Sequence, residues 1–137
     1  MTTAVREAMV PDPRVLQASA SAQEAGELLV RPEVHAVLVV DGERLVGRVG
    51  AAQLVEGVVA AGRDPRTTRV GELAAPIELT VAPDDPLDAA YRLMEESDVE
   101  RLPVTDRGRL VGVLSRSGLQ RRLAEDAPPE PEPAETY

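Results

Sequence analysis

The chain has 137 residues, a net charge of −9 at pH 7, one histidine (His35) and no cysteine. This length allows one domain or two small units, and the missing cysteines and lone histidine argue against disulfides and a protein-built metal site. The acidic balance opposes nucleic-acid binding, and neither a membrane span nor a signal peptide is visible. We therefore expect a cytoplasmic protein that binds neither nucleic acid nor membrane.

The chain is predicted to be a tandem repeat. Arg-Leu-Val-Gly begins at Arg44 and again at Arg109, 65 residues later (109 − 44), and sliding the chain by 65 aligns many further apolar positions. A repeat in one register indicates a duplicated structural unit. The predicted segments are a first unit over 5–62, a linker over 63–69, a second unit over 70–124 and a tail over 125–137.

The first repeat is predicted to have the order β-α-β-β-α. Ser21 and Glu24 match a capping box, which places a helix start there. Apolar side chains then recur at helical spacing, and Asp41-Gly42 is a strong hairpin signal between two strands. The expected elements are an extended piece at Arg14–Gln17, the helix after Ser21, strands at His35–Val40 and Arg44–Val49, and a helix at Ala51–Ala61.

The second repeat shows the same order. Asp85 is the predicted N-cap residue and Pro86 the first helical residue. The tail over 125–137 is rich in Pro and Glu and has too few apolar residues to offset its ordering entropy, so it is predicted to be disordered. The remaining expected elements are an extended piece at Glu78–Ala82, strands at Arg101–Thr105 and Arg109–Leu114, and a helix at Ser117–Ala124.

The stretch TVAPDDPLDAAYRLMEESDVERLPVTDRGRLVGVLSRSGL, residues 80–119, resembles the cystathionine-β-synthase (CBS) domain family. The resemblance rests on a Val-x-Pro start, an Ala and a Met on the helix, a Leu-Pro-Val strand and a Gly before Val-Leu-Ser. The first repeat keeps the same skeleton in a more degenerate form. The resemblance covers about 120 residues and implies an α/β (α+β) fold in which tandem β-α-β-β-α repeats form a free-standing CBS-domain pair, or Bateman module.

The resemblance also implies a function. Such pairs are regulatory, and many members bind adenine nucleotides or S-adenosylmethionine in clefts between the two units. They commonly associate as dimers. For this chain it implies AMP, ADP, ATP or S-adenosylmethionine as a regulatory ligand, a homodimer and an unidentified protein partner that reads the ligand.

The family's nucleotide site uses Ser/Thr-x-x-Asp after the second strand, and neither repeat completes this motif. The second repeat has Ser115, but Gly118 stands at the acidic position; the first has Gly50 and Gln53 instead. A ribose-binding carboxylate makes charge-assisted hydrogen bonds of roughly 1.5–3 kcal/mol each. Its absence is therefore expected to cost ~2–4 kcal/mol, or about 30- to 1000-fold in affinity.

Other residues of the second repeat fit a ligand site on the same resemblance. Arg101 and Arg116 would bind phosphate, because arginine offers forked donors, and Ser117 begins a helix whose amides would face an anion. Each also has a plainer interpretation, namely a helix cap at Ser115–Ser117 and a solvated charge at Arg101. Leu102 and Pro103 are expected to be core and cleft wall together. The candidate ligand-binding residues are Thr80, Arg101, Leu102, Pro103, Ser115, Arg116, Ser117 and Gly118.

The sequence bears on three classes of function. A ligand-sensing regulatory module is favoured by the residues kept in the second repeat. A structural or dimerisation module without ligand is the alternative, favoured by Gly50, Gln53 and Gly118. An enzyme is disfavoured, because the sequence shows no nucleophile–base pair and no cluster of metal ligands, so no catalytic residue and no metal ligand is assigned.

Overall fold

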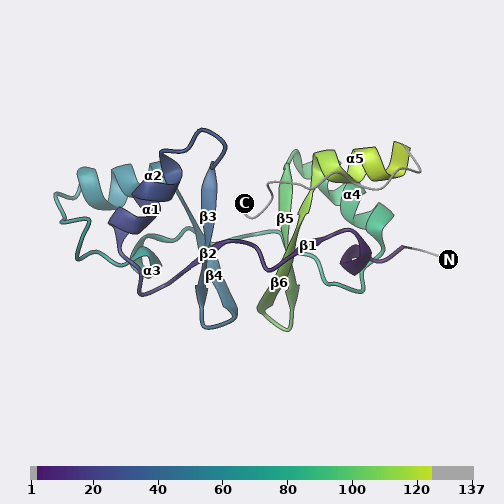
Figure 1. Ribbon diagram of the computed structural model, residues 1–137, viewed down its shortest axis with the longest axis horizontal. Coiled ribbons are helices and arrows are strands. Elements are labelled where there is room, and N and C mark those ends of the chain that lie inside the picture. Colours follow the sequence, from purple (N-terminus) through teal and green to yellow (C-terminus); the bar gives the residue numbers. More distant parts are fainter. Residues whose placement is uncertain (1–2, 125–137) are drawn as a thin grey trace. The chain divides into compact units, whose positions relative to one another are not determined.

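The computed structural model of the protein describes residues 3–124, which fold into two compact units (Figure 1). The first compact unit comprises residues 14–78. The second compact unit comprises residues 3–13 together with residues 79–124. The predicted disorder of the tail over 125–137 concerns residues outside this description. No helix among the described residues has the length and apolar character needed to cross a membrane.

The first compact unit is a small sheet covered by helices (Figure 1). β2 runs parallel to β3, and β3 pairs with β4 in an antiparallel hairpin. The predicted capping box is confirmed, since Ser21 Oγ accepts a hydrogen bond from the N–H of Glu24 at 3.2 Å and Glu24 Oε2 accepts one from the N–H of Ser21 at 2.8 Å. The elements are β2 (Val15–Gln17), α1 (Ala22–Leu29), β3 (Ala36–Asp41), β4 (Arg44–Gly50), α2 (Ala51–Leu54), η2 (Val55–Val59) and α3 (Val70–Leu73).

The second compact unit has the corresponding architecture. β5 and β6 form an antiparallel hairpin, and β1 pairs with β6 in the antiparallel direction. The nearly continuous apolar run of each central strand is explained by burial, for example at Leu102, Pro103 and Val104. The elements are η1 (Val5–Glu7), β1 (Val10–Pro11), α4 (Leu87–Ser97), β5 (Arg101–Asp106), β6 (Arg109–Ser115) and α5 (Arg116–Ala124).

One detail of the predicted elements was wrong, and the structure refines two others. Asp85 does not cap α4: the N-cap is Pro86, and Asp85 Oδ2 instead accepts a hydrogen bond from the N–H of Ala82 at 2.9 Å in the preceding turn. The helix expected over Ala51–Ala61 is a short α-helix that continues as the π-helix η2. The extended piece at Glu78–Ala82 pairs only at Val81, which forms a parallel bridge to Val104.

The compact units and the sequence repeats differ in where the leading segment of each repeat lies. Val5, near the start of the first repeat, is fully buried in the core of the second compact unit, whereas Val70, at the start of the second repeat, is fully buried in the core of the first. The repeat boundaries at 5–62, 63–69 and 70–124 thus describe the sequence duplication and not the compact units. Each repeat contributes its leading segment to the unit built around the other repeat.

The glycines of the two Arg-Leu-Val-Gly runs permit this arrangement. A Cβ at Gly47 would lie 2.3 Å from the carbonyl oxygen of Ala75, and a Cβ at Gly112 would lie 2.9 Å from that of Val10. Both distances are shorter than a carbon–oxygen contact allows. Val10 and Ala75 are themselves 65 positions apart (75 − 10), so the same close approach occurs once in each unit.

The predicted linker over 63–69 is an ordered part of the first compact unit. The first amides of α1 donate to it: Ala22 N–H to the carbonyl of Thr68 at 2.8 Å, and Gln23 N–H to that of Pro65 at 3.0 Å. Within the linker, hydrogen bonds from Arg66 lower the pKa of Asp64 below its ordinary value. The linker therefore accepts hydrogen bonds from the free N–H groups at the start of α1, in addition to joining the repeats.

Candidate functional site

Most of the predicted ligand-binding residues lie at one end of the β5–β6 hairpin in the second compact unit. The strand register places Arg101 directly opposite Ser115, and side chains in such a pair point to the same face of a sheet. Arg116 and Ser117 follow at once, as the first two residues of α5. The fold thus gathers two arginines and two hydroxyls where a strand ends and a helix begins.

Ser115 is the residue that turns β6 into α5. Its Oγ accepts a hydrogen bond from the N–H of Gly118 at 3.1 Å and lies 3.2 Å from Ser117 Oγ, and the residue is 7% exposed. This is the geometry of a helix N-cap. The plainer interpretation of Ser115 as a cap is therefore confirmed. A cap hydroxyl still has lone-pair and donor capacity for a second partner.

Arg116 is partly buried beside two acidic side chains. Its Nη1 lies 3.2 Å from Asp98 Oδ1 and 3.6 Å from Glu100 Oε1, and its side chain is 20% exposed. Its backbone N–H donates to the carbonyl of Glu100 at 2.8 Å. The guanidinium thus lies beside two carboxylates at the start of α5, and arginine's forked donors bind carboxylates and phosphates alike.

The other predicted residues are distributed differently. The side chain of Leu102 is 1% exposed and belongs to the core cluster with Leu114 and Met94. Because strand side chains alternate between faces, Pro103 lies on the opposite face from Leu102, on the same side as Arg101. Thr80 is exposed and precedes the Val81 bridge to β5. Pro103 therefore remains a candidate wall of the site, whereas Leu102 supports the site from within the core.

The first compact unit replaces the ligand motif with backbone contacts. Gln53 Oε1 accepts a hydrogen bond from the N–H of Gly50 at 2.7 Å, so the residue at the acidic position is used to cap α2. A Cβ at Gly50 would lie only 3.1 Å from the carbonyl oxygen of His35. A serine hydroxyl at position 50 would therefore require the neighbouring strand end to shift. His35 itself is exposed and immediately precedes β3.

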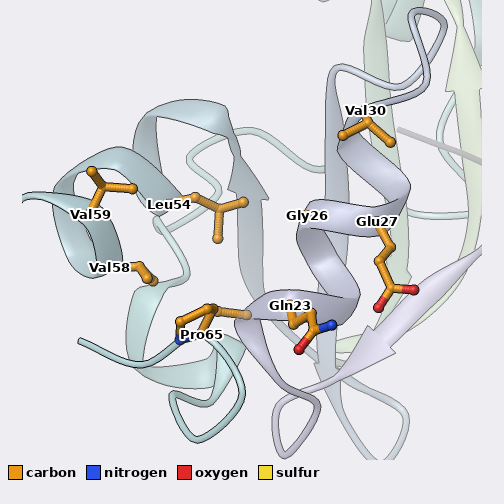
Figure 2. Close-up of a pocket in the computed structure, with 9 residues that line it drawn as sticks. Gln23, Gly26, Glu27, Val30, Leu54, Val58, Val59 and Pro65 are labelled. Carbon is orange, nitrogen blue, oxygen red and sulfur yellow. The ribbon is translucent and has the colours of Figure 1, made fainter. Parts of the chain in front are cut away.

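Sequence reasoning missed an apolar groove on the first compact unit. It has a volume of about 450 Å³ and lies between α1 and the α2–η2 segment, as Figure 2 shows. Two of its valines are strongly exposed, Val30 at 80% and Val59 at 74%. The lining residues are Ala22, Gln23, Gly26, Glu27, Val30, Leu54, Val58, Val59 and Pro65.

The duplicated unit explains part of this opening. The residue 65 positions after Gly26 is Tyr91, which packs against the core of the second compact unit. The hydroxyl of Tyr91 accepts a hydrogen bond from Gln120 Nε2 at 3.1 Å, which ties α4 to α5. Gly26 offers no such side chain, so the space between α1 and α2–η2 stays open. In the repeat alignment, the glycine at position 26 opposite the tyrosine at position 91 would have indicated this groove.

Among residues 3–124, no three His, Asp or Glu side chains are grouped so that they could hold a metal ion. The described acidic residues near the site instead pair with Arg116.

Comparison with known proteins gives matches over most of the chain. The sequence profile of the CBS domain matches twice, over residues 5–60 and 70–125. Hypoxic response protein 1 of Mycobacterium tuberculosis is 36% identical over 87 residues, which are 64% of this chain and 61% of that protein. The aligned part of the chain thus spans about three fifths of that relative's length.

Two solved structures share the fold. The crystal structure of Hypoxic Response Protein I with two coordinated zinc ions has a TM-score of 0.72 and 26% identity, and covers 88% of this chain and 98% of that one. The structure of CBSX2 in complex with AMP has a TM-score of 0.70 and 31% identity, and covers 88% of this chain and 96% of that one; CBSX2 is a protein of Arabidopsis thaliana.

Proposed function

The chain belongs to the CBS domain family and carries the domain twice as a CBS-domain pair, and we propose that it is a non-catalytic regulatory module of the cytoplasm. On this proposal it senses an adenine nucleotide or a related small anionic ligand, with S-adenosylmethionine as the alternative adenosyl ligand, and relays the occupancy to a protein partner. Such control requires that the ligand bind one conformation more tightly than another. The proposal includes a homodimer as the functional state.

One observation carries the proposal: the register that sets Arg101 opposite Ser115, with Arg116 and Ser117 next in the chain. Two cations and two hydroxyls at one strand end form a suitable environment for a phosphate. The structural relative CBSX2, at 31% identity, is described in complex with AMP. The first repeat has neither the hydroxyl nor the acid, so the proposed site belongs to the second.

Binding is expected to be weak, because Gly118 offers no carboxylate to the ribose. On the bond values above, the loss is about 30- to 1000-fold in affinity. Calorimetry with AMP, ADP, ATP and S-adenosylmethionine, taken to millimolar concentration, tests the proposal. A ligand at 100 times its Kd stabilises the folded state by ~2.7 kcal/mol, so the melting temperature should also rise. No binding and no stabilisation by any of the four would refute it.

The second candidate function is a structural or dimerisation module without a ligand. It is favoured by the use of Gln53 and Ser115 as caps and by the exposed Val30 and Val59 beside the groove. Sedimentation of the chain with and without AMP separates the two functions. A dimer that is unchanged by nucleotide, together with the absence of nucleotide binding, would favour the structural module.

A further inference from the structure

The ion pairs of Arg116 are asymmetric in exposure. The arginine side chain is 20% exposed, whereas the side chains of Asp98 and Glu100 are 94% and 73% exposed. Solvent screens an ion pair whose carboxylate is exposed, and fully exposed ion pairs contribute only about 0.2–1 kcal/mol. The guanidinium is thus the fixed member of the cluster, and the carboxylates are the members that can be displaced.

We propose that Asp98 and Glu100 are internal competitors for the ligand anion at Arg116, and that they restrict the site to phosphate monoesters. This inference rests on the proposed function, because it concerns the same site. With both carboxylates in place, the cluster of one cation and two anions has a net charge of −1. Both carboxylates lie at Nη1 of Arg116, so an anion that binds through this nitrogen replaces a carboxylate there.

The replacement of a carboxylate by the ligand anion on Arg116 determines which class of anion binds well. Replacing one carboxylate by another monoanion leaves the attraction to Arg116 almost unchanged. A phosphate monoester carries about −1.5 to −2 at pH 7 and three acceptor oxygens, so it gains on exchange. We therefore expect AMP to bind better than 3′,5′-cyclic AMP, whose phosphodiester is a monoanion. The affinity for neutral adenosine should not depend on whether the carboxylates of Asp98 and Glu100 are present.

The backbone allows a clean substitution at position 98. Asp98 has a left-handed conformation with φ of 52°, which asparagine adopts about as readily as aspartate. The N–H of Arg116 donates to the carbonyl of Glu100 and does not involve either carboxylate. Asp98→Asn therefore removes the charge and leaves the turn after α4 in place.

Asp12 provides the matched control. It lies in the same compact unit, is exposed and has φ of 49°, so Asp12→Asn repeats the change of charge and of side chain in the same backbone conformation. Glu96→Gln, on the exposed face of α4, is the corresponding control for Glu100→Gln.

The experiment is calorimetric titration of the full chain and its variants with AMP, cyclic AMP and adenosine at low ionic strength. Asp98→Asn should raise the affinity for AMP about three-fold, and the double variant with Glu100→Gln about ten-fold, from the range of exposed ion pairs. Adenosine should be unaffected, and the controls should bind AMP as the unmodified chain does.

The outcomes separate the two proposals. If the unmodified chain binds AMP and Asp98→Asn brings no gain, or brings an equal gain for adenosine, the competitor role is overturned and the proposed function stands. An equal affinity of the unmodified chain for AMP and cyclic AMP would overturn the restriction to monoesters. If even the double variant binds none of the three compounds, the competitor role is overturned, and the proposed function is then decided by the titrations with ADP, ATP and S-adenosylmethionine.

Discussion

Ser115 Oγ accepts a hydrogen bond from the N–H of Gly118 at 3.1 Å. The serine that begins the family's ligand motif is therefore the N-cap of α5, and the glycine at the motif's acidic position is the third residue of that helix. At the corresponding position in the first repeat, Gln53 Oε1 accepts a hydrogen bond from the N–H of Gly50. Both repeats therefore keep a helix cap at the motif, and both lack the carboxylate at its acidic position.

Gly118→Asp should strengthen nucleotide binding. Position 118 lies in the first turn of α5, where a negative charge is favoured by the helix dipole. Its φ lies outside the left-handed region, since the only such glycines among residues 3–124 are Gly42, Gly62 and Gly108. Restoring the acid should raise the affinity for AMP by about 30- to 1000-fold, measured by calorimetry.

Gly118→Asn separates charge from shape. It supplies a side chain of the same size without the charge-assisted hydrogen bonds, so it should regain only a small part of the affinity. Equal affinities of the Asp and Asn variants would show that the missing carboxylate is not the cause of weak binding.

Gly47→Ala and Gly112→Ala should destabilise the protein, because each new methyl group would meet backbone at 2.3 Å and 2.9 Å respectively. Overpacking of this kind costs roughly 1–3 kcal/mol, and Gly47→Ala should be the more severe because its contact is shorter. Urea unfolding measures the loss. Gly26→Ala is the control: its Cβ would lie 3.8 Å from Leu54, and an alanine within α1 should stabilise by about 0.5–1 kcal/mol.

The exchange of leading segments predicts where core truncations act. Val5→Ala should cost about 2 kcal/mol and lower the hydrogen-exchange protection of β5 and β6, because Val5 packs in their core. Val70→Ala should instead lower the protection of β3 and β4. If each substitution instead lowered the protection of the strands in its own repeat, the assignment of the leading segments to opposite compact units would be contradicted.

Much of this fold follows from the sequence, for reasons that differ between residues. Asp41-Gly42 and the apolar runs of β3 and β5 specify hairpins locally. Val5 and Val70 match in the repeat register, which predicts burial, but apolar character does not say which core receives them. Asp85 looked like a helix cap because its side chain favours that role, and the turn to Ala82 competes for the same oxygen.

The site was predictable in part. The positions of Ser115 and Arg116 follow from the motif, because strand and helix boundaries fix them. The pairing of Arg116 with Asp98 and Glu100 depends on how the end of α4 meets the start of α5, and no sequence spacing encodes that contact. The groove depends on a missing side chain at Gly26, which only the comparison with Tyr91 makes visible.

Stability should fall in acid partly through the linker. Hydrogen bonds from Arg66 lower the pKa of Asp64, and those from Arg69 and Arg63 lower the pKa of Glu72. A carboxyl whose pKa is lower in the folded state stabilises that state above its unfolded pKa of about 4, and this contribution is lost as the pH falls through the folded value. Asp64→Asn should therefore lose less stability between pH 7 and pH 3 than the unmodified chain, as measured by urea unfolding.

The control for the acid experiment is Asp12→Asn, which removes an exposed carboxylate from the other compact unit. It removes one negative charge and leaves the hydrogen bonds from Arg66 to Asp64 in place. If Asp64→Asn shows the same loss between pH 7 and pH 3 as this control, the linker carboxylate does not contribute.

The central claim is that the second repeat binds a nucleotide phosphate at Arg116, and titration of the unmodified chain and of Arg116→Gln with AMP tests it most directly. Arg101→Gln serves as a companion variant, because Arg101 lies opposite Ser115. We predict binding in the millimolar range or tighter, weakened about ten-fold or more by Arg116→Gln through loss of a charge-assisted hydrogen bond. No binding by the unmodified chain, or binding that Arg116→Gln leaves unchanged, would contradict the claim.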